Sequence, residues 1–157
     1  MRPERGAEGF TYLELIATAT ILMILASAIL PTAKVMRVRN KEIELRRELR
    51  SLRGAIDAYK LAVDQGRIGG SDVKLGSEGY PPTLEKLVEG VSQVGKIDTK
   101  LKFLRRVPVD PMTGKAEWNM RCYQDDADDT SWCGENVYDV MSTSQGTALD
   151  GSKYSEW

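Results

Sequence analysis

The sequence predicts an α+β fold in which a long N-terminal hydrophobic helix packs on a small antiparallel β-sheet. Residues 10–33 are almost entirely apolar, and residues 34–65 continue with apolar side chains at helical spacing. Residues 66–157 are rich in turns and short strand-like segments, so they allow only a small sheet. The 157-residue chain is long enough for one domain and an anchor.

The apolar run carries a single charge, the carboxylate of Glu14. A run of about 24 residues is long enough to span a bilayer, and a carboxylate at mid-bilayer costs about 2.5–3.5 kcal/mol and usually has a partner. Three interpretations compete: a removable secretory signal cleaved near residues 26–28, a signal-anchor for a periplasmic enzyme, and a processed segment that begins after Gly9. The run is long for a signal peptide and contains Glu14, and a signal-anchor gives Glu14 no purpose.

Beyond the apolar run, an amphipathic helix is expected to continue to about Gln65-Gly66, where glycine suits a helix C-terminus. Its apolar side chains are spaced alternately by four and three residues: Leu45, Leu49, Leu52, Ile56, Tyr59 and Val63. A narrow stripe of this kind packs in a short coiled coil or, as we expect here, against the protein's own sheet. Together with the apolar run it forms one helix of about 55 residues.

A short helix is predicted from Leu84 to Glu89, because Thr83 is a suitable N-cap and Gly90 a suitable stop. The segment 110–114, DPMTG, has the proline and glycine of a turn. These features predict a C-terminal part built from short elements that pack on the long helix.

Two predicted strands, 116–123 and 135–142, flank a loop bounded by Cys122 and Cys133, the only cysteines of the chain. Their spacing fits no usual zinc or redox motif. The thiols are either buried separately or joined in a disulfide, and the acidic sequence between them favours the disulfide because it can hardly bury thiols. A disulfide across this short loop implies an oxidising compartment and contributes about 2–3 kcal/mol.

The sequence has no evident catalytic constellation, so we do not expect an enzyme. There is no histidine, which removes the commonest general base and zinc ligand. The paired carboxylates Asp125/Asp126 and Asp128/Asp129 lie in a polar loop, and no phosphate-binding glycine loop is present. The formal net charge of −1 predicts no nucleic-acid partner.

The segment GFTYLE, residues 9–14, with Pro31 downstream, resembles the processing motif of type IV prepilins and type II secretion pseudopilins. The resemblance implies that residues 1–9 are a leader, that a prepilin peptidase cleaves between Gly9 and Phe10, and that Phe10 is then N-methylated. It also implies that Glu14 pairs with the freed amino group of Phe10 in a neighbouring subunit. Pro31 falls where many family members carry proline, and it is expected to kink or locally melt the helix.

Three C-terminal segments resemble the major pseudopilin of type II secretion: YPPTLEKLVEG, LRRVPVDPMTGKAEW and VYDVMSTSQGTALDGSKYSEW. In that family the last loop binds calcium, which prefers six to eight hard oxygen ligands. The candidate ligands here are Asp150, Ser142, Ser144 and Asp139. The chain departs from the family at Gln145-Gly146, where Asp-Gly is often found, so the acidic loop could hold calcium instead, or the disulfide could replace the metal.

The resemblance implies a subunit of type IV pilin-like fold that polymerises into a periplasmic helical filament of the type II protein secretion machinery. Its partners would be further copies of itself, minor pseudopilins, the prepilin peptidase and an inner-membrane assembly platform with its ATPase. Residues 10–33 would form the transmembrane and filament-core helix, 34–65 its amphipathic continuation, and 66–157 a periplasmic globular region. The alternatives are a type IV pilus pilin, for adhesion or motility, and a membrane-anchored periplasmic binding domain.

The distribution of basic residues opposes this topology. Lysine and arginine are frequent in residues 34–53, whereas the leader has only Arg2 and Arg5, and the positive-inside rule would place the C-terminal region in the cytoplasm. Three glutamates interleave the basic residues, and a disulfide needs an oxidising side. We therefore expect a single pass through the bacterial inner membrane with the C-terminal region in the periplasm, and the filament there or outside the cell.

Overall fold

The computed structural model describes residues 9–69, 73, 76–96, 99–126, 129 and 131–157, without the side chains of residues 28–32. All of the predicted leader except Gly9 lies outside these residues. The chain divides into two compact units, Met1–Arg39 and Asn40–Trp157. The division therefore falls several residues after the expected boundary between residues 33 and 34.

One long helix, α1, runs from Tyr12 to Asp64 and has 53 residues, close to the expected length. Thr11 precedes it as the N-cap, and its Oγ1 accepts a hydrogen bond from the backbone N–H of Glu14 at 3.3 Å. The helix is continuous through position 31, so the local melting expected at Pro31 is not seen. After Asp64 the chain turns at Gly66, whose φ of +66° suits a glycine that ends a helix.

The structure corrects the expected membrane span. Among the described residues, no helix is both long and apolar enough to cross a membrane, so the predicted single-pass inner-membrane anchoring at residues 10–33 is wrong. The first turn of α1 also carries a charge, the carboxylate of Glu14.

The second half of α1 confirms the predicted amphipathic stripe. Leu45, Leu49, Leu52, Ile56 and Tyr59 are all buried, with at most 2% of each residue exposed. They join one hydrophobic cluster with side chains from the rest of the unit: Leu84, Leu87, Val91, Trp118, Val137, Val140 and Tyr154. The stripe therefore packs on the protein's own C-terminal elements, and the coiled-coil alternative is not needed to bury it.

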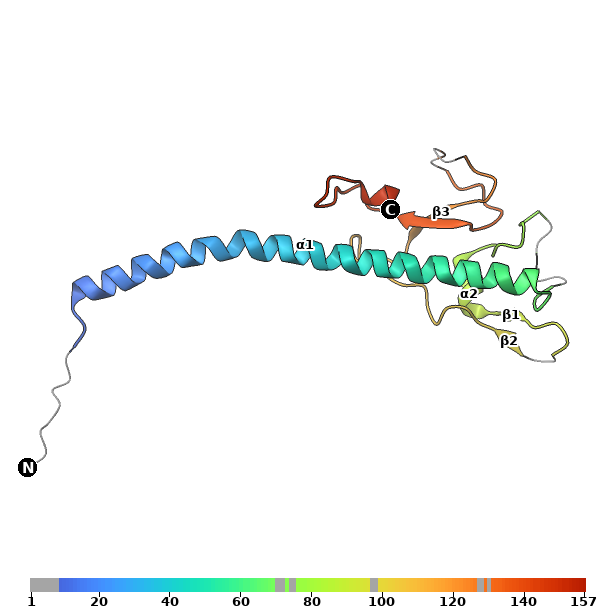
Figure 1. Ribbon diagram of the computed structural model, residues 1–157, viewed down its shortest axis with the longest axis horizontal. Helices are drawn as coiled ribbons and strands as arrows, with labels where there is room; N and C mark the ends of the chain where they lie inside the picture. Colours follow the sequence, from blue (N-terminus) through green and yellow to red (C-terminus); the bar gives the residue numbers. More distant parts are fainter. Residues whose placement is uncertain (1–8, 70–72, 74–75, 97–98, 127–128, 130) are drawn as a thin grey trace, which may run out of the picture. The chain divides into compact units, whose positions relative to one another are not determined.

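The described strands form two small antiparallel sheets. Strand β1 (Val91–Ser92) pairs with β2 (Lys100–Leu101), and β3 (Trp118–Arg121) pairs with β4 (Asp139–Ser142). The β3–β4 pair confirms the expected antiparallel strands, although each is shorter than predicted, and the β1–β2 pair was not expected. In Figure 1, β3 and β1–β2 lie on different sides of the second half of α1.

The short helix α2 (Leu84–Glu89) has the predicted bounds. Thr83 precedes it, but its side chain makes no capping hydrogen bond. Gly90 follows with a φ of +84°, and a Cβ there would lie only 2.9 Å from the backbone oxygen of Leu101. Gly90 is therefore required both by the turn and by the close approach of β2.

The last described element, the 3-10 helix η2 (Tyr154–Glu156), is tied to α1 over long sequence distances. Glu42 Oε1 accepts hydrogen bonds from the backbone N–H of Leu149 at 2.8 Å and from the Tyr154 hydroxyl at 3.0 Å. Burial and this contact with Glu42 raise the pKa of the Tyr154 hydroxyl. These contacts fix the C-terminal segment along the helix.

Candidate assembly surfaces

The predicted processing site lies just before α1 begins. Gly9 and Phe10 are outside the helix and exposed, and 83% of Phe10 is accessible. A Cβ placed on Gly9 would meet no atom within 4 Å. The Gly9–Phe10 peptide bond is therefore sterically open to a peptidase in this structure.

Large apolar side chains are exposed around the first part of α1 and just before it. They are Phe10, Tyr12, Leu13, Leu15, Ile16, Ile21, Leu22, Met23, Ile24 and Leu25. On the same part of α1, the hydroxyl groups of Thr18, Thr20 and Ser27 are satisfied within the helix, because each donates to the carbonyl oxygen three or four residues earlier, at 2.8–3.0 Å. A helix that is apolar all round needs a covering partner, and the hydroxyls do not oppose such burial.

Glu14 has a local role that sequence reasoning missed. It occupies the third position of α1, where it matches the capping-box sequence Thr11-x-x-Glu14 and where a negative charge favours the helix start. Among the described residues its carboxylate has no ion-pair partner. The four-residue sequence pattern was sufficient to predict this cap. The Glu14 carboxylate is thus compatible with an isolated helix and is still available to pair with a cation.

The cysteines form the predicted disulfide, with a sulfur–sulfur distance of 1.93 Å between Cys122 and Cys133. In the loop, Asp125 Oδ2 accepts a hydrogen bond from the backbone N–H of Cys122 at 2.7 Å, and Asp129 Oδ2 accepts one from that of Asp126 at 2.9 Å. Asp125 lies near both sulfur atoms, but these are bonded to each other and are not metal ligands. Asp125 and Asp129 therefore both accept hydrogen bonds from backbone N–H groups of the disulfide-closed loop.

The four predicted calcium ligands are placed in separate interactions. Asp139 forms an ion pair with Arg53 at 2.7 Å, and Asp150 forms a longer one with Arg46 at 3.4 Å. Hydrogen bonds from Ser152, and then the charge of Arg46, lower the pKa of the Asp150 carboxyl.

The two predicted serine ligands are engaged in hydrogen bonds. The buried Ser142 hydroxyl donates to Asp110 Oδ2 at 2.7 Å, and Ser144 Oγ accepts from the backbone N–H of Gly146 at 3.3 Å. Calcium binding through these residues stays a prediction.

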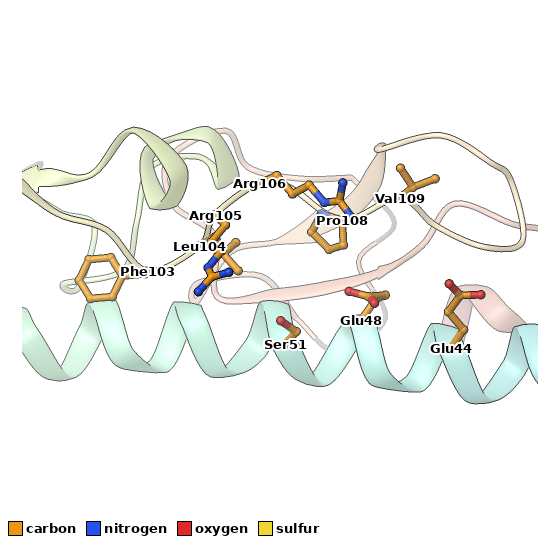
Figure 2. Close-up of a pocket in the computed structure, with 9 residues that line it drawn as sticks. All are labelled: Glu44, Glu48, Ser51, Phe103, Leu104, Arg105, Arg106, Pro108 and Val109. Atoms are coloured by element: carbon orange, nitrogen blue, oxygen red, sulfur yellow. The ribbon is translucent and has the colours of Figure 1, made fainter.

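A cleft of about 430 Å³ lies between α1 and the segment that follows β2 (Figure 2). Its lining residues are Glu44, Glu48, Ser51, Phe103, Leu104, Arg105, Arg106, Pro108 and Val109. The glutamates rise from α1 toward the segment that carries the two arginines. Within the described part of the chain, these four charges form no ion pair with one another. A rim carrying both charges suits contact with another protein surface.

A second groove, of about 370 Å³, is lined by three arginines of α1, by Leu49 and by Trp157. Arg53 donates to Asp139 and also to the backbone oxygens of Val140 and Trp157, at 3.0 and 2.9 Å. Arg46 lies over the Trp157 ring, 4.1 Å from its centre. The sequence does not indicate this groove, because nothing local in it places Trp157 against the arginines.

Comparisons of the chain with protein-family models, with curated proteins and with solved structures find no match.

Proposed function

We propose that this protein is a structural subunit that polymerises into a helical filament, with a type IV pilin-like fold closest to the pseudopilins of type II secretion. The observation that carries the proposal is the first part of α1, whose large apolar side chains are exposed in the single chain. The proposed partners are other copies of the chain, minor pseudopilins, the prepilin peptidase and an assembly platform with its ATPase.

Burial of these side chains supplies the driving force. Each large apolar side chain contributes about 1.5–3 kcal/mol when fully buried, whereas association costs about 4–15 kcal/mol in lost freedom of motion. Ten such side chains, if packed among neighbouring helices, outweigh that cost. The internally bonded hydroxyls of Thr18, Thr20 and Ser27 enter such a core without losing a hydrogen-bond partner.

Glu14 sets the register in this proposal. Cleavage after Gly9 would free the amino group of Phe10, and in a stack of parallel helices this cation would pair with Glu14 of a neighbouring copy. An unpaired carboxylate buried among apolar helices is destabilising by several kcal/mol. Only a subunit in the correct register relieves this penalty.

The test compares Glu14→Gln with Thr11→Ala in the full chain. Glutamine keeps the capping-box side chain but removes the charge, whereas the alanine variant removes the cap hydrogen bond, worth about 1 kcal/mol, and keeps the charge. Each variant is co-expressed with a prepilin peptidase and a filament assembly system. Leader removal is read by N-terminal sequencing, and filaments are counted by electron microscopy.

We expect Glu14→Gln to be processed normally but to lose filaments by roughly tenfold or more. Thr11→Ala should form filaments at nearly the normal level. Normal filament numbers with Glu14→Gln would refute the pairing, and an equal loss with Thr11→Ala would assign Glu14 to the helix cap instead. A wild-type chain that is never processed and forms no filaments would refute the proposed function.

A further inference from the structure

The arginine groove, defined as Arg46, Leu49, Arg50, Arg53 and Trp157, presents positive charge around an apolar floor. The three arginines are spaced by four and three residues along α1, so they share one face of the helix. The half-buried Trp157 ring supplies most of the apolar surface of the groove, because Leu49 is only 2% exposed. This combination suits an acidic segment that also carries an apolar or aromatic side chain.

The positive charge of the groove is only partly used within the chain. Arg53 is engaged by Asp139, but the ion pair of Arg46 with Asp150 is long and both side chains are more than half exposed. Arg50 donates only to the backbone oxygen of Arg46, and among the described residues it has no carboxylate partner. The groove therefore retains an unpaired guanidinium at its rim.

The same chain carries a matching surface in the acidic loop, defined as the described residues 123–126, 129 and 131–132 between Cys122 and Cys133. This segment contains aspartates but no lysine or arginine, and the disulfide closes it. The side chains of Asp126 and Asp129 are exposed, and Tyr123 beside them is 55% exposed. None of the described carboxylates of the loop forms an ion pair.

We infer that the arginine groove of one subunit receives the acidic loop of a second copy of the chain. The inference rests on the proposed function and specifies one contact between neighbouring subunits. The two surfaces are different patches of the chain, so the contact is heterologous, and such contacts can repeat to form an open helical filament. Complementary charge mainly selects the partner and its register, whereas the apolar first part of α1 supplies most of the affinity.

A charge-exchange experiment on the full chain tests this contact. Arg50→Glu reverses the charge at one position of the groove, and Asp126→Arg reverses it at one position of the loop; both side chains are exposed, so the fold should tolerate either change. Lys102→Glu is the matched control, because it makes the same charge change at an exposed position outside the groove. Assembly is measured as filament yield and, independently, by cross-linking of an Ile16→Cys substitution between copies.

Each single charge reversal should lower the filament yield by roughly tenfold, whereas Lys102→Glu should leave it unchanged. Co-expression of the Arg50→Glu chain with the Asp126→Arg chain should restore most of the yield, because each reversed charge in a groove can then meet a reversed charge in a loop. Such rescue by mixing requires contact between copies and is not expected of a contact within one chain.

Normal assembly of both single variants would overturn the inference and leave the proposed filament intact. The inference would also be overturned if Arg50→Glu lowered the filament yield, Asp126→Arg did not, and mixing the two chains gave no rescue. Another anionic surface would then occupy the groove. Absence of both filaments and Ile16→Cys cross-links in the otherwise unchanged chain would refute the proposed function itself.

Discussion

Replacing Arg53 by alanine should destabilise the Asn40–Trp157 unit by about 2–3 kcal/mol. The guanidinium joins α1 to β4 and to the end of the described chain through Asp139, Val140 and Trp157. Its ion pair with Asp139 is about one-third exposed and contributes at most about 1 kcal/mol. The two hydrogen bonds to backbone oxygens contribute about 0.5–1.5 kcal/mol each. The variant would also leave both carbonyl groups without this donor.

The measurement is urea unfolding of the full chain followed by tryptophan fluorescence. All three tryptophans lie in the Asn40–Trp157 unit, so the signal reports on that unit. With a denaturant slope of about 1–3 kcal/mol per molar urea, the midpoint should fall by about 0.7–3 M. Arg50→Ala is the matched control, because among the described residues its guanidinium bonds only to its own helix, and its effect should stay below about 0.5 kcal/mol. Equal midpoints for the Arg53 and Arg50 variants would refute the assigned role of Arg53.

Two further predictions concern a turn and a titrating group. Gly90→Ala should lower the free energy of unfolding by about 1–3 kcal/mol, because the new Cβ would combine backbone strain with a 2.9 Å approach to the backbone oxygen of Leu101. The control is Gly114→Ala, where φ is +75° and a Cβ would meet no atom within 4 Å, so this change should cost less in the same urea assay. Equal losses of unfolding free energy in the two variants would contradict the clash at Gly90. Because the folded state holds the Tyr154 proton more tightly than the unfolded state, its share of stability is complete below pH 10.0 and is lost as the pH rises through the higher folded pKa. The stability difference between the unchanged chain and Tyr154→Phe should therefore shrink above pH 10.0, and a constant difference would contradict the raised pKa.

Elements with a strong local signal were predictable from the sequence. The alternating four- and three-residue spacing from Leu45 to Tyr59 identified the buried stripe, and Thr83 and Gly90 gave the bounds of α2. The acidic composition between the cysteines was enough to favour their disulfide. Thr11-x-x-Glu14 was also a sufficient local signal for the helix cap, because the pattern matches a capping box at the start of the apolar run.

Contacts between distant residues were not predictable in the same way. The β1–β2 pair has only two residues in each strand, too few for a periodic pattern to be visible. Arg53 and Trp157 are 104 positions apart, and no local rule brings them together. For the same reason the sequence does not indicate that arginines of α1 and Trp157 line a groove. The membrane span was inferred from the length of the apolar run and from the resemblance to prepilins, and the described helix does not support it.

The strap formed by Glu42 and Tyr154 has a consequence for how the protein folds during synthesis. The two residues are separated by 112 positions, and the contact between them closes nearly the whole Asn40–Trp157 unit. Ribosomes add about 5–20 residues per second, so the segment around Tyr154 is synthesised roughly 6–20 s after the apolar stripe of α1 that it helps to cover. During that interval a nascent chain presents two uncovered apolar surfaces, the stripe and the first part of α1. Chaperone binding early in translation is therefore expected to matter more for this protein than its modest size suggests.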